Sequence, residues 1–437
     1  LAGEDAVKYA GEQYLPRLEG QADGEYSAYK ARASFFNATA RTADGYLGLV
    51  FRRPPFIKVP EGGSVLGRAL EAFANDADML GTSLADYARN VVKEVVAVGR
   101  AGTLVDWEGE SEQRVYASLY TAEQILNWRM ERIHGRNVLT LLCLYERVRG
   151  MGDDADEFET KEGEQIRVLK LVKRGPEQSQ AGRASSPSEP SGENMAAARG
   201  DRSPYPAYVV EIWRKEKATP STLSPQSSTS QKERWVMVDR RVPLRFGQPL
   251  PLIPFVFHGA SNFLPGVEKL PLADVIAVNL DHYRLDADYK HGMHFTALPT
   301  AWVSGFDKSD PLRVGSSTAW VTDTIGAAAG FLEYTGQGLT TFERAMDRDE
   351  RQMAILGARL LETQKRVGEA AEAIELRQSG ENSILGSLAA SVGHSLTQVL
   401  RWAYWWNSTE ALPEDVGRDQ VLIELNTDFS TKGLSAQ

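Results

Sequence analysis

The sequence predicts an α+β fold. Three observations lead to it: helical patterns precede residue 100, strand patterns dominate the middle third, and two long amphipathic helices enclose a short strand-like segment. We expect the long helices at 271–294 and 340–366, where a rise of 1.5 Å per residue makes each about 35–40 Å long. This layout is more typical of a protein that lines a channel than of an enzyme that encloses a substrate.

The N-terminal part is predicted to hold three helices. The first ends before Pro54 and Pro55, which cannot continue it. Ser83 is a good N-cap for the third helix, and Gly99 is a good terminator. A capping box then opens at Thr121. In order, the expected elements are helices at 23–50, 64–75 and 83–98, strands at 103–107 and 114–120, and a short helix from 121 that carries Asn127 and Trp128.

The middle third is rich in strand patterns. Two low-complexity stretches, 175–206 and 218–232, interrupt it; both are rich in Ser, Pro, Gly and Gln and lack the apolar residues of a core. We expect them to be mobile surface insertions on a β-lobe. The predicted strands are 138–148, 165–172, 208–214, 234–238 and 254–258.

Each long helix carries an apolar stripe at helical spacing. The stripe of the first helix is Leu272, Ile276, Leu280, Tyr283 and Ala287. The second helix opens with a capping box, and its stripe is Phe342, Met346, Met353, Gly357 and Leu360. Its other face is charged and could meet solvent, a neighbouring subunit or a channel; it consists of Glu343, Arg344, Asp347, Arg348, Glu350 and Arg351.

A further helix is predicted at 382–407, followed by a strand at 421–425. Its core stripe is Leu385, Leu388, Val392, Leu396, Val399 and Ala403. A second face of small residues would let a neighbouring helix approach closely; it consists of Gly386, Ala390, Gly393 and Thr397. An aromatic cluster ends the helix, and a buried anchor is the favoured interpretation over a base-stacking platform; it consists of Trp402, Tyr404, Trp405 and Trp406.

Composition narrows the class of protein. With 437 residues and 42% hydrophobic residues, the chain can bury a large core. Cys143 is the only cysteine, so an intrachain disulfide is impossible; we expect a small buried side chain and folding in a reducing cytoplasm. We expect no signal peptide and no membrane span. The net charge of −10 argues against a static clamp on DNA, although it permits DNA to slide past.

The sequence does not favour an enzyme. It lacks the phosphate loop of a packaging ATPase, the Gly-x-Ser-x-Gly nucleophile motif and the His-Glu-x-x-His zinc motif. We therefore expect no catalytic residue and no cofactor. One cluster suggests a metal, because histidines at i and i+3 can share one, but histidine near a helix end often simply caps it. The cluster is His282, Asp286, His291 and His294.

Several short motifs together resemble the portal proteins of tailed bacteriophages, and in particular a portal-like group of phages and prophages. The main motifs are 252–257, 271–274 and 279–289, which contain Leu-Ile-Pro-Phe-Val-Phe, Pro-Leu-Ala-Asp and Asn-Leu-Asp-His-Tyr-Arg. Similar likeness is found at 50–55, 125–129 and 353–361. Each motif alone is weakly specific, whereas their order is more specific.

The resemblance implies a portal fold with long stem helices, a small clip, a mixed α/β wing and a helical C-terminal part. Such proteins form a ring, usually of twelve subunits, at one capsid vertex. The implied domains are the wing at 1–270, a stem helix at 271–294, the clip at 295–335, the second stem helix within 336–366, a tunnel loop at 367–381, and a wing or crown helix with a final strand at 382–437.

The resemblance also implies partners and channel residues. Double-stranded DNA would pass through the ring during packaging and ejection. The terminase large subunit and head–tail adaptors would dock on it, and major capsid and scaffold proteins would surround it in the virion, after assembly in the host cytoplasm. The expected channel residues are Lys365, Arg366, Glu369, Glu372 and Glu375. Another virion protein, such as a minor head protein or adaptor, is the alternative, ahead of a metal-dependent enzyme.

Overall fold

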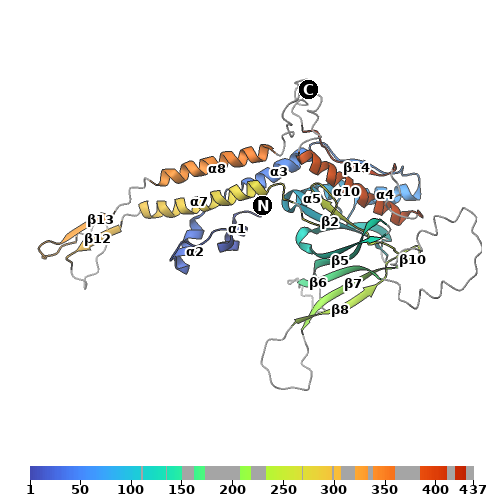
Figure 1. The fold of residues 1–437 in the computed structure, drawn as a ribbon, viewed down its shortest axis with the longest axis horizontal. Coiled ribbons are helices and arrows are strands. Elements are labelled where there is room, and N and C mark those ends of the chain that lie inside the picture. The colour runs from blue at the N-terminus through green and yellow to red at the C-terminus, as the bar shows by residue number, and fades with distance from the viewer. Residues whose placement is uncertain are drawn as a thin grey trace, which may run out of the picture. The chain divides into compact units, whose positions relative to one another are not determined.

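The computed structural model describes residues 1–109, 112–133, 135–149, 162–172, 207–217, 233–267, 269–297, 300–306, 320–332, 338–359, 384–410 and 419–429. The chain forms two compact units, which we call the helical unit (Leu1–Tyr46 and Pro271–Glu362) and the β-rich unit (Leu47–Leu270 and Thr363–Gln437). Helices and antiparallel sheets are both present (Figure 1), so the predicted α+β class is confirmed.

The helical unit combines the two long helices with the start of the chain. The helix predicted at 271–294 is α7 (Ala273–Ala297), and the described part of the second is α8 (Leu339–Arg359). Between them, β12 (Thr300–Ser304) pairs antiparallel with β13 (Ala328–Leu332). The N-terminal elements are α1 (Glu4–Ala10), the 3-10 turn η1 (Gly11–Gln13), α2 (Asp23–Arg32) and α3 (Ala38–Val50), which begins in this unit.

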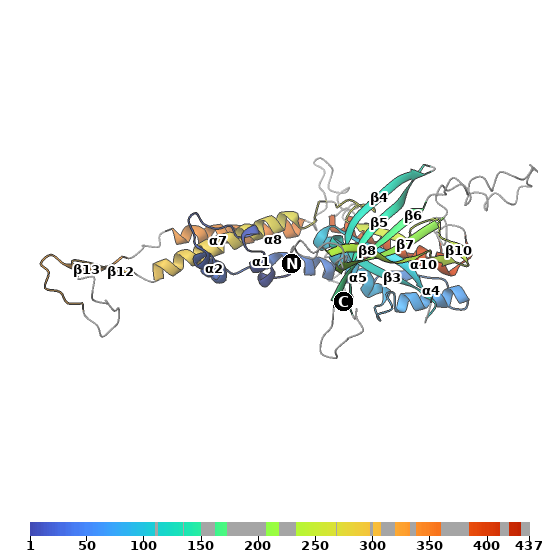
Figure 2. The same cartoon turned by 90° about the horizontal axis from the view of Figure 1, so that it is seen from below.

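The β-rich unit contains two main sheets. One is a five-stranded antiparallel meander in the order β4-β5-β6-β7-β8, whose strands lie side by side in Figure 2. The other has the order β11-β2-β3. The strands are β2 (Arg100–Glu108), β3 (Arg114–Thr121), β4 (Ile125–Ile133), β5 (Arg136–Arg149), β6 (Glu162–Val172), β7 (Ala207–Lys217), β8 (Glu233–Arg241) and β11 (Phe255–Gly259).

Shorter elements complete this unit. Helices α4 (Val65–Asn75) and α5 (Leu84–Val98) begin after Ser64 and Ser83, whose hydroxyls accept hydrogen bonds from first-turn amides as N-caps. Gly99 ends α5 in the left-handed conformation, with φ of 78°. The small strand pairs are β1 (Phe56–Lys58) with β14 (Leu422–Glu424), and β9 (Leu244–Arg245) with β10 (Gln248–Pro249).

Helix α10 (Ile384–Asn407) forms the centre of the core, where it contacts α4, α5, β2, β3, β11 and β14. The whole predicted apolar stripe is buried, and so is the aromatic cluster at its end. The Trp406 indole N–H donates to the Val105 carbonyl at 3.1 Å, while its ring stacks on Trp107. Arg245 donates to the Trp405 carbonyl and covers the last turn. The cluster is therefore a buried anchor.

A chain of buried polar groups joins α10 to the three-stranded sheet and α5. Ser395 Oγ donates to the Val392 carbonyl, so it accepts from His258 Nδ1 at 2.7 Å. This fixes the neutral tautomer, in which Nε2 accepts from Thr103 Oγ1 at 2.7 Å, and Tyr87 then donates to Thr103. Burial lowers the pKa of His258 to about 3. The group is thus held uncharged inside the core.

An ionic cluster lies among the two main sheets. Arg167 on β6 contacts Glu146 Oε1 on β5 at 2.7 Å and lies 4.0 Å from Asp106 on β2. Tyr120 on β3 also donates to Glu146. Burial raises the pKa of Asp106, although Arg167 and the Trp107 amide partly offset the effect. One cation thereby serves two carboxylates from different sheets.

Two sequence predictions were wrong locally. The single helix expected at 23–50 is two, because Asn37 caps α3 by accepting from the Ala40 amide and the chain is extended after Ala33. The capping box at Thr121 closes only a 3-10 turn, η2 (Ala122–Gln124). Asn127 and Trp128 then lie on β4, because cross-strand pairing with Cys143 and Leu142 overrides local helix signals.

Other expectations are met in part. Cys143 is half-buried, and burial raises the pKa of its thiol. Two residues of the predicted small-residue face of α10 approach strand β14, whereas Ala390 of that face is exposed: a Cβ on Gly393 would lie 3.2 Å from the Ile423 carbonyl oxygen, and Thr397 accepts from the Ile423 amide. Within the described residues, no helix is both long and apolar enough to cross a membrane. The low-complexity stretches 175–206 and 218–232 lie outside the described residues.

Because His258 is buried in its uncharged form, we expect the protein to lose stability in acid. The ordinary pKa of histidine is about 6.5, whereas the folded value is about 3. The unfolded chain therefore binds an additional proton between these values. We expect the free energy of unfolding to fall by about 1.4 kcal/mol per pH unit in that window, as measured by denaturant titration. His258→Leu should remove this contribution to the slope and cost about 2–4 kcal/mol at neutral pH. His394→Gln, at an exposed position of the same helix, is the control and should change neither.

Because Gly393 lies close to β14, we expect a larger side chain at this position to clash with that strand. Gly393→Leu should push β14 away and lower stability by about 1–3 kcal/mol, seen as a lower Tm. Ala390→Leu adds a similar side chain at an exposed position of the same helix and should leave the Tm nearly unchanged. Equal melting temperatures for the two variants would contradict the assignment.

Candidate functional site: the paired helices and their hairpin

The motif at 279–289 lies on α7, where its polar side chains bind the start of the chain. Asn279 is 1% exposed. Its Oδ1 accepts from the amide and hydroxyl of Thr39 at 3.1 and 2.8 Å, and its Nδ2 donates to the Phe36 carbonyl at 2.7 Å. Since the Thr39 amide belongs to the first turn of α3, Asn279 satisfies a donor that the helix itself cannot.

The next two turns of α7 continue this docking. Asp286 accepts from the Ser34 amide at 2.7 Å, and Asp288 accepts from the Tyr29 hydroxyl at 2.6 Å. Burial, reinforced by this bond, raises the pKa of Tyr29. Arg284 Nε donates to the Tyr14 carbonyl at 3.0 Å. Four polar side chains of α7 thus hold the N-terminal segment, which we define as residues 1–37.

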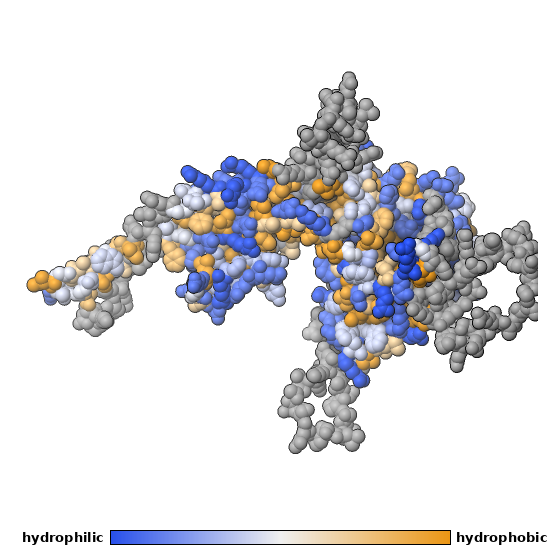
Figure 3. Space-filling model, in the orientation of Figure 1, coloured by the Kyte–Doolittle hydropathy of each residue, from blue (hydrophilic) through white to orange (hydrophobic). Residues whose placement is uncertain are grey.

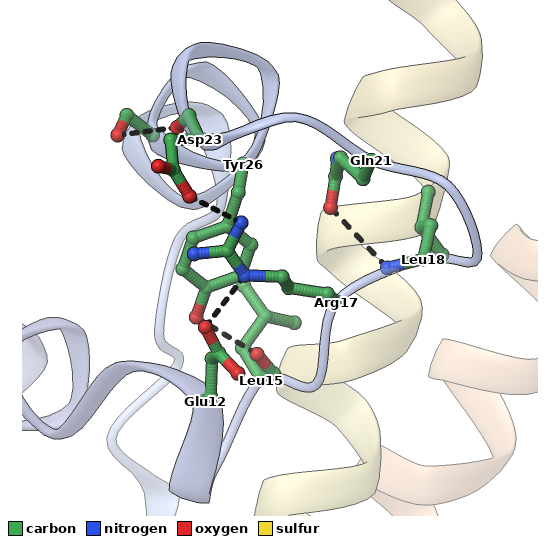
Figure 4. A network of polar contacts seen from close by, with 8 residues as sticks. Glu12, Leu15, Arg17, Leu18, Gln21, Asp23 and Tyr26 are labelled. Carbon is green, nitrogen blue, oxygen red and sulfur yellow. Dashed lines mark hydrogen bonds and ion pairs between the residues drawn. The ribbon is translucent and has the colours of Figure 1, made fainter.

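Local bonds shape the N-terminal segment for this contact. Arg17 contacts Glu12 and Asp23, each at 2.6 Å, and lies over the ring of Tyr26. Tyr26 donates to the Leu15 carbonyl, and Leu18 donates to Gln21 (Figure 4). The buried residues beneath this turn form one cluster with α7; it includes Val7, Leu15, Tyr26, Tyr29, Tyr283 and Ala287.

A different flank of α7 packs against α8, and three contacts show that the helices run antiparallel. A Cβ on Gly292 would lie 2.9 Å from Leu339, at the start of α8. Tyr289 donates to Glu343 at 2.7 Å, and further along His282 lies 3.5 Å from Glu350. Residue numbers fall on α7 as they rise on α8, and both views show the pair side by side (Figures 1 and 2).

Helix α8 has one buried face and a broad exposed one. Asp349, Met353 and Gly357 are buried, and the Gly357 carbonyl accepts from the Tyr46 hydroxyl. The predicted pair of Asp347 and Arg351 is present, at 3.9 Å. The mixed-charge face that the sequence left open is exposed to solvent within this chain.

The β12–β13 hairpin between the two helices carries exposed apolar side chains. Figure 3 shows hydrophobic residues at this end, interspersed with paler ones. Trp302 on β12 and Phe331 and Leu332 on β13 are each about half-exposed. Large apolar groups on a two-stranded sheet cannot bury one another fully, so they suit a contact with another protein.

The four residues that suggested a metal have other neighbours in the structure. His282 contacts Glu350, whereas Asp286 is bound to Ser34 and Lys290. His291 packs edge-on against Tyr29 and Phe295, and His294 packs against Phe295. Burial, together with Arg32, lowers the pKa of His291. Across the part of the chain that the structure describes, no group of three or more His, Cys, Asp or Glu residues could hold a metal.

The channel residues expected from the sequence cannot be placed. Lys365, Arg366, Glu369, Glu372 and Glu375 lie outside the described residues, as does the rest of 367–381. Sequence reasoning also missed the docking of the N-terminal segment on α7. The available signal was the presence of three short polar side chains, Asn279, Asp286 and Asp288, within three turns of the predicted helix.

The comparisons with known proteins give one family model that matches part of the chain and two weak structural likenesses. A family model described as a domain of unknown function (DUF4055) matches residues 271–407, from α7 to the end of α10. No curated protein matches this chain. One similar solved structure is a chain of the virion of a native gene transfer agent particle, with 9% identity and a TM-score of 0.37. Another is from the neck of an empty gene transfer agent particle computed with C6 symmetry, with 10% identity and a TM-score of 0.38. Each alignment covers 98% of this chain and 90% of the other.

Asn279 provides a test of the docking. Asn279→Leu removes three hydrogen bonds at a buried site and should cost about 2–4 kcal/mol. Hydrogen exchange should then accelerate in α2 and at the start of α3. Ala277→Ser, at an exposed position of α7, is the control and should leave exchange unchanged.

Proposed function

We propose that this protein is a portal: identical copies close into a ring around a channel through which double-stranded DNA is packaged and ejected. The observation that carries the proposal is the antiparallel pair α7 and α8 with a β-hairpin at the end where α7 finishes and α8 begins. This is the arrangement that the portal resemblance implies for a stem and a clip. A channel protein needs rigid rods of this kind, and a pair of packed helices provides them.

In this proposal each part has a role. Helices α7 and α8 are the stem, and the segment 295–335 is the clip. The exposed Trp302, Phe331 and Leu332 suit a clip that meets the terminase large subunit and later the head–tail adaptors. The β-rich unit is the wing, close to major capsid and scaffold proteins. The protein would be located in the virion, at one capsid vertex, after assembly in the host cytoplasm.

The proposal gives the protein a passive part in DNA movement. Lys365 and Arg366 would make brief phosphate contacts, and Glu369, Glu372 and Glu375 would keep DNA from sticking in the tunnel loop. A separate motor would hydrolyse ATP. The absence of a phosphate-loop motif from the sequence supports this division of work.

Electron microscopy tests the central claim. Purified protein, viewed from the top in negative stain, should show closed rings with a central hole, usually of twelve subunits in the resembled family. Analytical ultracentrifugation should give the same stoichiometry. A monodisperse monomer under all assembly conditions would contradict the portal proposal and favour a different virion protein.

A deletion tests the proposed tunnel loop. Removing residues 368–379 should leave ring formation intact while DNA packaging or retention falls, because the deleted segment would act on DNA and not on the fold. Ring assembly by microscopy and packaged DNA by nuclease protection are the two measurements. Loss of the rings themselves would show that this segment is structural.

A further inference from the structure

The exposed face of α8 divides into two stripes of opposite charge. Successive residues of an α-helix are rotated by about 100°, so Glu343, Asp347 and Glu350 lie within about 60° of one another. Arg344, Arg348 and Arg351 lie within a second sector of similar width. The centres of these two stripes differ by roughly 100° around the helix. The sequence therefore places an acidic and a basic stripe on adjacent sides of α8.

Asp347 of the acidic stripe, and Arg348 and Arg351 of the basic stripe, are not neutralised inside the chain. The side chains of Asp347, Arg348 and Arg351 are 65%, 74% and 79% exposed. The contacts between charges are long: Asp347 lies 3.9 Å from Arg351, and Arg348 lies 3.6 Å from Asp349. Exposed pairs of this kind contribute about 0–1 kcal/mol. Most of the charge therefore remains available to a partner.

The two stripes face in different directions relative to the rest of the helical unit. The acidic stripe borders α7, since Glu343 accepts from Tyr289 and Glu350 lies beside His282. The basic stripe lies opposite the buried face that contains Asp349 and Met353. The acidic stripe could thus contact one neighbouring molecule while the basic stripe contacts a second one on the adjacent side of α8.

We infer that α8 joins neighbouring copies of this chain, with the acidic stripe of one copy against the basic stripe of the next. The inference rests on the proposed ring. In a closed ring, neighbours are related by rotation without translation, so the contact joins two different surfaces of the same chain. Residues of equal number then lie at equal height along the axis. Each acidic residue is followed directly by an arginine, so the two stripes differ in height by only about 1.5 Å.

The basic stripe suits a protein partner better than a nucleic acid. Ile355, which is 53% exposed, continues the stripe by one turn and adds an apolar contact. A surface hollow of about 290 Å³, lined by Arg348, Arg351, Gln352, Ile355 and Leu356, could receive a side chain of a neighbouring helix. DNA phosphates at this surface would also meet the carboxylate of Asp347, which borders Arg348 and Arg351. Complementary charges of this kind set register and partner choice more than affinity.

Charge reversal tests the contact. Variant one carries Asp347→Lys and Glu350→Lys, and variant two carries Arg344→Glu and Arg348→Glu. Each variant alone would bring mostly like charges together at every interface, and we expect a roughly tenfold or greater loss of rings at low salt, measured by microscopy and light scattering. An equal mixture should restore rings of alternating copies, because each variant then meets opposite charges on both sides. A single chain with all four substitutions should also restore them.

Controls separate this inference from the proposed function. Arg68→Glu with Glu71→Lys, at exposed positions of α4, should leave the rings unchanged. Circular dichroism should give similar melting temperatures for all variants. Rings in either reversed variant alone, or failure of both the mixture and the four-fold variant, would overturn the inference and leave the portal proposal intact. The inference would also be overturned if variant two formed intact rings that no longer retain a double-stranded DNA fragment. That result would show that the basic stripe binds DNA. Wild-type protein that never forms rings would overturn both.

Discussion

The helical unit depends on how α7 distributes its contacts. One flank binds the N-terminal segment through Asn279, Asp286 and Asp288, and another packs against α8 through His282, Tyr289 and Gly292. Asn279 is buried and would be costly if unpaired, but three hydrogen bonds satisfy its amide. Asp286 and Asp288 are partly buried, and each accepts a hydrogen bond from the N-terminal segment. Because α7 is covered on two flanks, α8 is the helix that keeps a broad charged face open.

The β-rich unit is held by a different kind of contact. Here α10 lies in an apolar core, and directional bonds fix its position: His258 joins Ser395 to Thr103, and Trp406 reaches the Val105 carbonyl. Apolar packing provides most of the stabilisation, while hydrogen bonds to an uncharged histidine select one arrangement. This unit therefore depends on the ionisation state of one buried side chain.

Part of the fold could be predicted from the sequence, because apolar periodicity with Ser N-caps determines α4 and α5, and a long apolar stripe determines α10. The failures have tertiary causes. The division of α2 from α3 depends on Asn37 and on Asp286, which is about 250 residues away, and β4 forms because β5 pairs with it. The polar residues Asn279, Asp286 and Asp288 on α7 could be read from the sequence, but their partners, about 240–260 residues away, could not. The channel residues rest on resemblance alone.

The link between the N-terminal segment and α7 has a consequence for synthesis. Tyr29 and Phe36 leave the ribosome long before Asp288 and Asn279, which bind them. At about 5–20 residues per second, this delay is roughly 10–50 s. During that time α2 lacks the surface that buries Tyr26 and Tyr29. A nascent chain would therefore expose these aromatic rings to chaperones, and translation speed could influence the yield of folded subunits.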